Sequence, residues 1–197
     1  MLMDAGMRQR LPRKADGACA TLRTTEADMA ELAQAVIDEF RGRMTRGLPE
    51  QVRACLDAMT EEQIWWRPNP ASNSVGNLVL HLCGSTRHFL GRAVGGTDYR
   101  RDRPAEFAEK GPIPRERLRA LLDETVAETD AVLASLTPAR LLEVTDRAGE
   151  PFTVLNLLLR TSHHWAVHVG QMVYAAKALR EGAFDELWMK TMLPPKK

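Results

Sequence analysis

The 197-residue sequence predicts an all-α protein, a four-helix bundle. Leu, Ala, Glu and Arg are abundant and runs of β-branched residues are scarce, a composition that favours helix. Four long segments carry apolar residues three and four positions apart, so each has one face to bury. A chain of this length suits one domain with a full-sized core. We therefore expect a basic leader, 1–25, and a helical bundle domain, 26–197.

Charge and cysteine content limit the classes of protein. The 27 basic and 26 acidic residues give a net charge of +1, which argues against a nucleic-acid partner. Three widely spaced cysteines without a CxxC pair do not form a disulfide framework, and no signal peptide is recognised, so we expect a cytoplasmic protein. The apolar runs fall short of the roughly 20 residues that span a bilayer, so we expect no membrane partner.

The N-terminal third is predicted to hold a leader and two helices. The basic leader either contacts nucleic acid or membrane or is disordered, and four charges without an amphipathic helix favour disorder. A helix is expected over 25–46, with Thr25 and Asp28 at its start and an apolar face. That face comprises Met29, Leu32, Ala33, Val36, Ile37 and Phe40. A second helical piece is expected over 48–59.

The segment 60–74 begins with a capping pattern and contains adjacent tryptophans. Thr60 and Gln63 fit a short capping box, and the prolines that follow stop any helix. Trp65 and Trp66 cannot both point into one face. One of them anchors the loop on the core or lines a pocket, and we favour the anchor.

A helix over 74–94 carries the first histidine of interest. It ends at Gly95 and Gly96, a C-cap signal. The apolar stripe consists of Val75, Leu78, Val79, Leu82, Thr86, Phe89 and Ala93. His81 lies on its edge. Three polar residues lie within about 40° of His81 on the helical wheel, namely Asn77, Ser85 and His88. Cys83 lies about 160° from His81 and is interpreted as a core residue.

The middle of the chain is expected to contain a loop, a helix and a hairpin. Residues 97–114 form a charged loop, a solvated connection in which Arg101 or Arg103 could also face an anionic ligand. A helix is expected over 115–136. The turn signal within 141–153 is compatible with a short hairpin.

The last helix, 154–180, carries the pair of histidines on which the functional prediction depends. His164 and His168 are four residues apart and therefore share one helix face, whereas His163 points away and should be exposed. The apolar residues of the tail, 183–197, either pack back on the bundle or cover a neighbouring subunit.

The histidine pair alone fits a metal site and an ordinary helix pair equally well. Both residues lie near the buried face, where an unpaired imidazole is costly, and His81 has a matching place on another helix. Gln171 and Asn77, one turn from these histidines, are candidates to orient them. Three neutral histidines without a carboxylate favour Zn²⁺, with Ni²⁺ as the second choice. Three protein ligands would leave open positions, at which the metal could activate a water or a thiol.

No catalytic residue is assigned. His88 lies two turns from His81, too far to bind the same ion, and is either a general base at the rim or an exposed residue. Ser85 is a candidate pocket residue. A nucleophile built on Cys83 or Cys55 has no supporting spacing. The sequence has no phosphate-binding loop, no HExxH motif and no paired carboxylate array.

The stretches 72–96, 101–114 and 161–179 resemble the DinB/YfiT-like superfamily, most of all a branch of uncharacterised small bacterial proteins with GNLxLHLxG and HxxxHxGQ motifs. The resemblance covers about residues 28–190 and implies a DinB-like bundle of up-down-down-up topology, often dimeric. It also implies a metal site whose ligands map onto His81, His164 and His168. The superfamily includes thiol-dependent S-transferases and isomerases, so a low-molecular-weight thiol is an expected cofactor.

The chain departs from that branch at three positions. Ser85 and His88 stand where Asn and Gln are usual, and Asn156 stands where Glu is common, so pocket chemistry does not transfer directly. We expect a metal-dependent enzyme with a small-molecule substrate, either a thiol-dependent S-transferase or a hydrolase, and a homodimer. The alternative is a non-catalytic metal- or small-ligand-binding protein, connected with stress. A third possibility is a bundle without metal.

Overall fold

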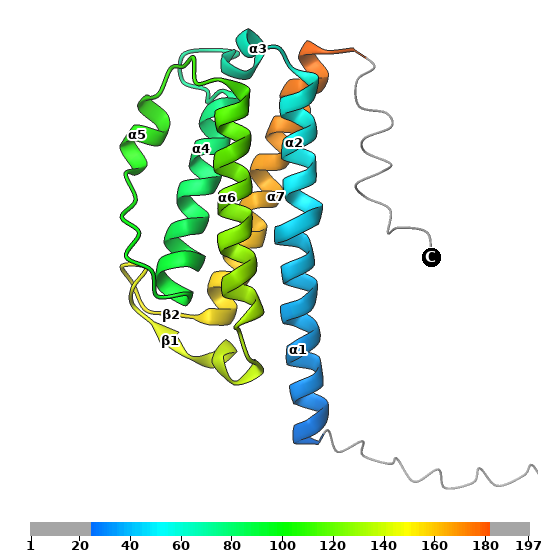
Figure 1. The fold of residues 1–197 in the computed structure, drawn as a ribbon, viewed down its shortest axis with the longest axis vertical. Helices are drawn as coiled ribbons and strands as arrows, with labels where there is room; N and C mark the ends of the chain where they lie inside the picture. The colour runs from blue at the N-terminus through cyan, green and yellow to red at the C-terminus, as the bar shows by residue number, and fades with distance from the viewer. Residues whose placement is uncertain (1–24, 182–197) are drawn as a thin grey trace, which may run out of the picture.

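The structure, a computed structural model, describes residues 25–181, and long helices dominate it (Figure 1). The helices of the first half are α1 (Glu26–Gly42), the π-helix η1 (Arg43–Gly47), α2 (Leu48–Ala58), α3 (Glu61–Trp65), α4 (Val75–Thr86) and the π-helix η2 (Arg87–Val94). The elements of the second half are α5 (Arg103–Ala108), α6 (Arg115–Ala134), the 3₁₀ helix η3 (Pro138–Leu142), β1 (Val144–Thr145), β2 (Phe152–Thr153) and α7 (Val154–Leu179). The expected all-α class is confirmed.

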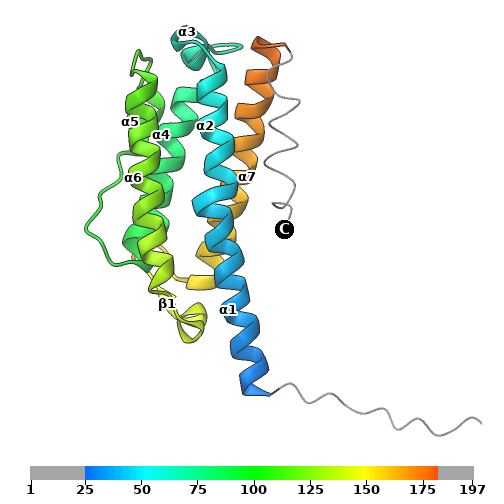
Figure 2. The same ribbon diagram turned by 45° about the vertical axis from the view of Figure 1, so that its right-hand side comes forward.

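The long helices pack side by side around one apolar core. In Figure 1, α2 and α7 run towards the end that carries α3, whereas α4 and α6 run away from it. Helix α4 packs against α6 and α7, and α2 packs against α7 and α6. The turned view shows that α1 extends beyond the other helices (Figure 2). Consequently Met29 and Leu32, expected on a buried face, are exposed, and burial begins at Ile37.

The first two predicted helices form one continuous helix, so the break expected between 46 and 48 is wrong. Thr25 caps it as predicted, with its hydroxyl accepting from Asp28 N and its own N–H donating to Asp28 Oδ2. Pro49 has no N–H to donate. The backbone accommodates it with a π turn, in which the Leu48 N–H donates to Arg43 O five residues back. The wider turn carries the helix past the proline.

Both tryptophan interpretations hold, each for a different residue. Trp65 anchors the loop: its Nε1–H donates to Ile113 O at 3.2 Å. The Trp65 ring lies so close to Gly76 and Gly111 that a Cβ at either position would come within 2.8 Å and 2.5 Å of it, respectively. Trp66 is 41% exposed and lines a cavity of about 580 Å³. The capping box of Thr60 and Gln63 at the start of α3 is confirmed.

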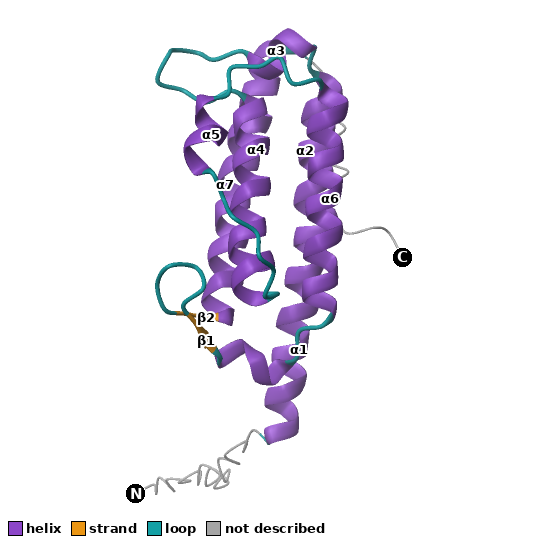
Figure 3. Cartoon of the chain, turned by 60° about the vertical axis from the view of Figure 1, so that its left-hand side comes forward, coloured by secondary structure: helices purple, strands orange, loops and turns teal. Residues whose placement is uncertain are grey.

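The segment between α4 and α6 is more ordered than expected. Residues 97–114 are not wholly a solvated connection, because they contain α5, whose Glu106 is buried against α4. The hairpin between α6 and α7 is confirmed, with Val144 paired to Thr153 in antiparallel register (Figure 3). The leader, 1–24, and the tail, 183–197, lie outside the described residues. Within 25–181, no helix combines the length and the apolar character needed to cross a bilayer.

Candidate metal centre

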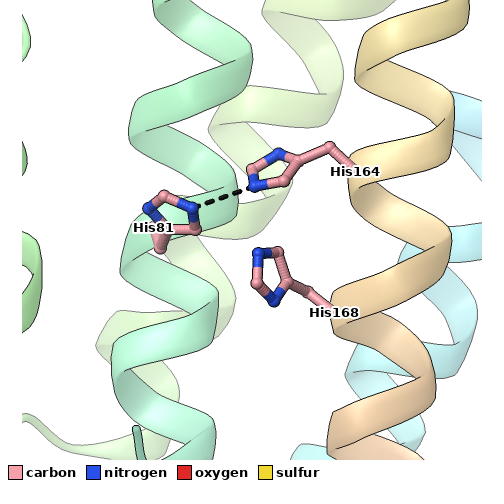
Figure 4. Close-up of side chains that lie close together, drawn as sticks. All are labelled: His81, His164 and His168. Atoms are coloured by element: carbon pink, nitrogen blue, oxygen red, sulfur yellow. Dashed lines mark hydrogen bonds between the residues drawn. The ribbon is translucent and has the colours of Figure 1, made fainter.

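Three histidines from two helices meet between α4 and α7 (Figure 4). His81 comes from α4, and His164 and His168 come from α7. The Nε2 atoms of His81 and His164 are 2.9 Å apart, and one ring nitrogen from each of the three residues lies within 4.8 Å of the others. The structure thus brings together the three histidines that the sequence singled out, as a group that could hold a metal ion.

The rotation of α7 about its axis decides which histidines face α4. Trp165 is 1% exposed, and its Nε1–H donates to Thr86 Oγ1 on α4 at 2.7 Å, which fixes α7 against α4. With Trp165 in the core, His164 and His168 lie on the shoulder of the interface and are half-buried. His163 is exposed, as the helical wheel predicted.

His81 is held on its far side by an ion pair that the sequence did not reveal. Its Nδ1 lies 2.9 Å from Glu106 Oε2, and both side chains are 8% exposed. Arg101 binds the same carboxylate through two contacts of 2.7 Å, from Nε to Oε1 and from Nη2 to Oε2. The bound arginine holds the carboxylate in place, and the carboxylate fixes the orientation of the imidazole ring.

The charge of Glu106 favours a proton on His81 Nδ1. Burial opposes ionisation of Glu106, but hydrogen bonds from Arg101 and His81 outweigh it and lower the pKa of this carboxyl below its usual value. An ionised carboxylate only accepts hydrogen bonds, so the 2.9 Å contact with Glu106 requires His81 Nδ1–H to donate. Arg101 Nη2 lies 3.0 Å from the same Nδ1, but its N–H groups are directed to the Glu106 carboxylate as well. The Nε2 lone pair of His81 then faces His164 and His168. Carboxylate–histidine pairs orient metal-binding imidazoles in the same way.

Gly84 makes room for this carboxylate. It lies one turn after His81 on α4, and a Cβ at Gly84 would overlap Glu106 Oε1. The absence of a side chain therefore allows α5 to approach α4 closely enough for Glu106 to reach His81. Gly84 is the one local sequence signal of the buried carboxylate.

The two histidines of α7 have weaker partners. His168 Nδ1 lies 2.7 Å from Gln171 Oε1, and His164 Nδ1 lies 3.3 Å from Ser85 Oγ. Burial, followed by the charges of His168 and His81 and of nearby arginines, lowers the pKa of His164 to about 4. Burial also lowers the pKa of His168. Both rings are therefore neutral near pH 7, which is the form that binds metal.

Two of the candidate pocket residues lie elsewhere. The Nδ2 group of Asn77 donates to Glu106 O and Glu109 O, so it holds the backbone of α5 and acts on His81 only through Glu106. His88 lies 3.3 Å from Ala148 O, beside the turn of the hairpin, and makes no contact with the three histidines. Its position on a separate turn of the helix keeps it outside the group.

The cysteines with described positions do not provide a nucleophile. Cys55 and Cys83 are buried, and burial raises the pKa of each thiol to about 12. A thiol with that pKa is almost entirely protonated near pH 7 and is a poor nucleophile. The interpretation of Cys83 as a core residue agrees with its 1% exposure.

The donor set fits a divalent transition metal. Zn–N bonds of about 2.0–2.1 Å in tetrahedral geometry place the nitrogens about 3.3 Å apart. The ring nitrogens here span separations from 2.9 Å to at most 4.8 Å, so small rotations of the side chains would meet that requirement. Imidazole suits Zn²⁺, Cu²⁺, Fe²⁺ and Ni²⁺. With Glu106 turned to the far side of His81, the three imidazoles supply the donors.

Comparisons with known proteins agree with this architecture. The family model of the DinB superfamily matches residues 44–172. The solved structure of a DinB-like protein from Bacillus subtilis is similar, with 18% identity, a TM-score of 0.55 and coverage of 72% of this chain and 91% of that one. A DinB-like protein from Bacillus cereus has 18% identity, a TM-score of 0.54 and coverage of 68% and 86%. No curated protein matches the chain. The family match covers more than half of the sequence, and the chain belongs to the DinB superfamily.

Proposed function

We propose that this chain is a metal-dependent enzyme for a small-molecule substrate, with a divalent ion, Zn²⁺ or Ni²⁺, held by His81, His164 and His168. The observation that carries the proposal is the convergence of three ring nitrogens within 4.8 Å beside a cavity that His81 and His164 help to line. Such an ion would act as a Lewis acid that activates either a water molecule, in a hydrolase, or a low-molecular-weight thiol, in an S-transferase.

The side chains around the histidines have distinct tasks in this proposal. Glu106 keeps the proton of His81 on Nδ1, and Gln171 accepts from His168 Nδ1, so that Nε2 of each ring has a lone pair to give to the ion. Arg101 holds the Glu106 carboxylate in its ionised form. These contacts prepare the imidazoles before any ligand arrives, which limits the cost of organising the site.

A non-catalytic binding protein is the alternative. It predicts a coordination sphere closed by protein groups. The three-histidine group instead provides only three donors and borders a cavity of about 610 Å³, large enough for a small molecule. This arrangement is typical of catalytic metal sites, which keep an open position, and it supports the enzyme over the binding protein.

The first test is elemental analysis of the full chain purified without a histidine tag. We expect close to one equivalent of metal, and less than about a tenth of an equivalent would overturn the assignment. His81→Ala, His164→Ala and His168→Ala should each lose the metal. His163→Ala is the matched control, because His163 is the exposed neighbour of His164 and its loss should leave the metal content unchanged.

The second test separates the two reactions. The metal-loaded chain is assayed with small thiols and an electrophilic acceptor, and in parallel with ester and amide substrates. Thiol consumption that requires metal would identify an S-transferase, and metal-dependent release of acid would identify a hydrolase. An absence of metal-dependent turnover in both assays would count against an enzyme and in favour of the binding protein.

A further inference from the structure

A basic cavity of about 610 Å³ adjoins the three histidines. Residues of α4, η2, α5 and α7 line it, and His81 and His164 form part of its wall. Three arginines, Arg101, Arg103 and Arg160, line the same cavity, whereas no Asp or Glu of residues 25–181 does. The lining therefore has an excess of positive charge next to the proposed metal.

Two of the three arginines have no carboxylate partner within the described chain. Arg101 is neutralised by its ion pair with Glu106. Arg103 and Arg160 form no ion pair with any residue of 25–181, and each guanidinium instead lies over aromatic rings. Arg103 lies 5.1 Å from the ring centroid of Phe107, and Arg160 lies 5.3 Å from that of Phe89. Contact with a ring face orients a guanidinium and leaves its N–H edge free to donate.

The chain places both free arginines on the histidine side of their helices. Arg160 is four residues before His164 on α7, and such residues are neighbours on one helix face. Arg103 is three residues before Glu106 on α5, which reaches His81. Thr161 also lines the cavity, and its buried hydroxyl oxygen has no hydrogen-bond partner in the described structure.

We propose that this cavity binds the anionic group, a carboxylate or a phosphate, of a small organic substrate whose reacting atom faces the three histidines. The guanidinium fork matches both anions, because two parallel N–H groups meet two oxygens. Arg103 and Arg160 hold the anion, and Phe89 and Val167 provide apolar contacts beside them. The identification of the anion as part of a substrate rests on the proposed function, whereas the anion site itself does not require a metal.

A second cavity gives the contrasting possibility. It has a volume of about 580 Å³ and is lined mainly by apolar side chains, among them Trp66, Leu78 and Tyr174, and by uncharged polar ones that include Gln171, the partner of His168. Val167 borders both cavities. An uncharged apolar substrate would enter this second cavity and would not depend on the arginines. The two cavities thus predict opposite responses to the charge of the ligand.

Calorimetry on the metal-free full chain tests the anion site, because without metal the probe cannot bind an ion directly. The probes are benzoate, phenyl phosphate and the uncharged benzamide. We expect either anion to bind more tightly than benzamide and to bind more weakly as salt concentration rises. Arg103→Gln and Arg160→Gln should each weaken the anions about tenfold, the loss expected for a charge-assisted contact. Arg→Lys at either position keeps the charge without the fork and should bind with intermediate affinity.

Arg117→Gln is the matched control, because Arg117 is exposed on α6, does not line this cavity and carries the same charge. It should leave the affinity for benzoate unchanged. Equal affinities for benzoate and benzamide, or equal losses in Arg117→Gln and Arg160→Gln, would overturn the anion site. If anions bind through these arginines but the purified chain contains no metal, the proposed enzyme fails and the anion site stands. If the purified chain contains metal but anion affinity does not depend on the arginines, the anion site fails and the proposed metal centre stands.

Discussion

The two sides of the histidine group differ in how firmly they are held. On the α4 side, His81 is buried and donates to Glu106, which is locked in turn by two contacts from Arg101. On the α7 side, His164 and His168 are half-buried. Apart from the contact between His164 and His81, each has one hydrogen-bond partner, Ser85 for His164 and the exposed Gln171 for His168. One side is a buried ionic network, and the other is a pair of half-buried rings without an ionic partner.

This difference indicates how rigidity and access can be divided within one site. A buried ion pair is costly to break, so it fixes the position of His81 whether or not a metal is present. The α7 rings are half-buried and are held by fewer contacts, so they can adjust to an ion and its ligand. Removal of contacts on the α4 side should therefore have larger effects than removal of contacts on the α7 side.

The largest effect is expected for Glu106→Ala. It removes the acceptor of His81 Nδ1–H and leaves Arg101, whose side chain is 11% exposed, without its partner. We expect the metal affinity to fall about 10–100-fold, as for other carboxylates that orient a metal-binding histidine. The free energy of unfolding should fall by about 3 kcal/mol, because one charge of a buried pair is left uncompensated. Metal competition with a chromogenic chelator and urea unfolding measure the two quantities.

Glu106→Gln is the companion variant, because the amide oxygen still accepts from His81 while the negative charge is lost. Its metal affinity should lie between those of the wild type and Glu106→Ala. Unchanged metal affinity in Glu106→Ala would show that the ion pair serves only the fold.

A smaller loss of the same kind is expected for Gly84→Ala. The new methyl group would overlap the Glu106 carboxylate and displace it from His81. We expect about a tenfold loss of metal affinity and a loss of unfolding free energy of about 1–3 kcal/mol from overpacking. Gly170→Ala on α7 is the control, because nothing lies within 4 Å of a Cβ there. It should preserve the metal affinity, and similar losses in both variants would contradict the role given to Gly84.

The free energy of unfolding of the metal-free protein should depend on pH in two ranges, one set by His164 on the α7 side and one by Glu106 on the α4 side. Burial lowers the pKa of His164 from 6.5 to about 4. As the pH falls, this ring is therefore protonated in the unfolded chain before it is protonated in the folded one. Stability should therefore fall as the pH falls from 6.5 to 4. Glu106 acts at lower pH, because its pKa is lowered in the folded protein. Its contribution to the free energy of unfolding is present above its ordinary pKa of 4.5 and is lost as the pH falls through the folded pKa.

Urea unfolding at pH 7 and pH 5 measures the α7 part of this dependence. His164→Gln should reduce the difference between the two pH values, because the titrating ring is gone. Gln171→Ala is the companion variant, because it leaves the His164 ring in place and should retain the difference. A difference that survives in His164→Gln would assign the effect to other groups.

The α7 histidines could be predicted because a long amphipathic helix has a strict period. One buried face, fixed by residues such as Trp165, determines the direction of every other side chain on the helix. The same reasoning placed His81 at the edge of the α4 stripe and His163 in solvent. Local pattern was sufficient there because the helices are long and each buries one side.

Glu106 could not be predicted in that way. It lies in a helix of six residues within a polar segment, and its burial depends on His81, 25 residues earlier, and on Arg101. No periodicity marks such a contact. The continuous helix through Pro49 was missed for a related reason, because packing against α7 and a π turn override the local preference for a break.

The smallest effects are expected on the α7 side. Ser85→Ala removes a 3.3 Å contact with His164, and Gln171→Ala removes the exposed partner of His168. Each change should lower the metal affinity about fivefold, the value of one ordinary hydrogen bond, and should alter the unfolding free energy by about 1 kcal/mol or less. The chelator competition used for Glu106→Ala measures the metal affinity of both variants, and urea unfolding measures their unfolding free energy. If Gln171→Ala lowered the affinity as much as Glu106→Ala, the α7 rings would be held as firmly as His81, and the division into a rigid and an adjustable side would be wrong.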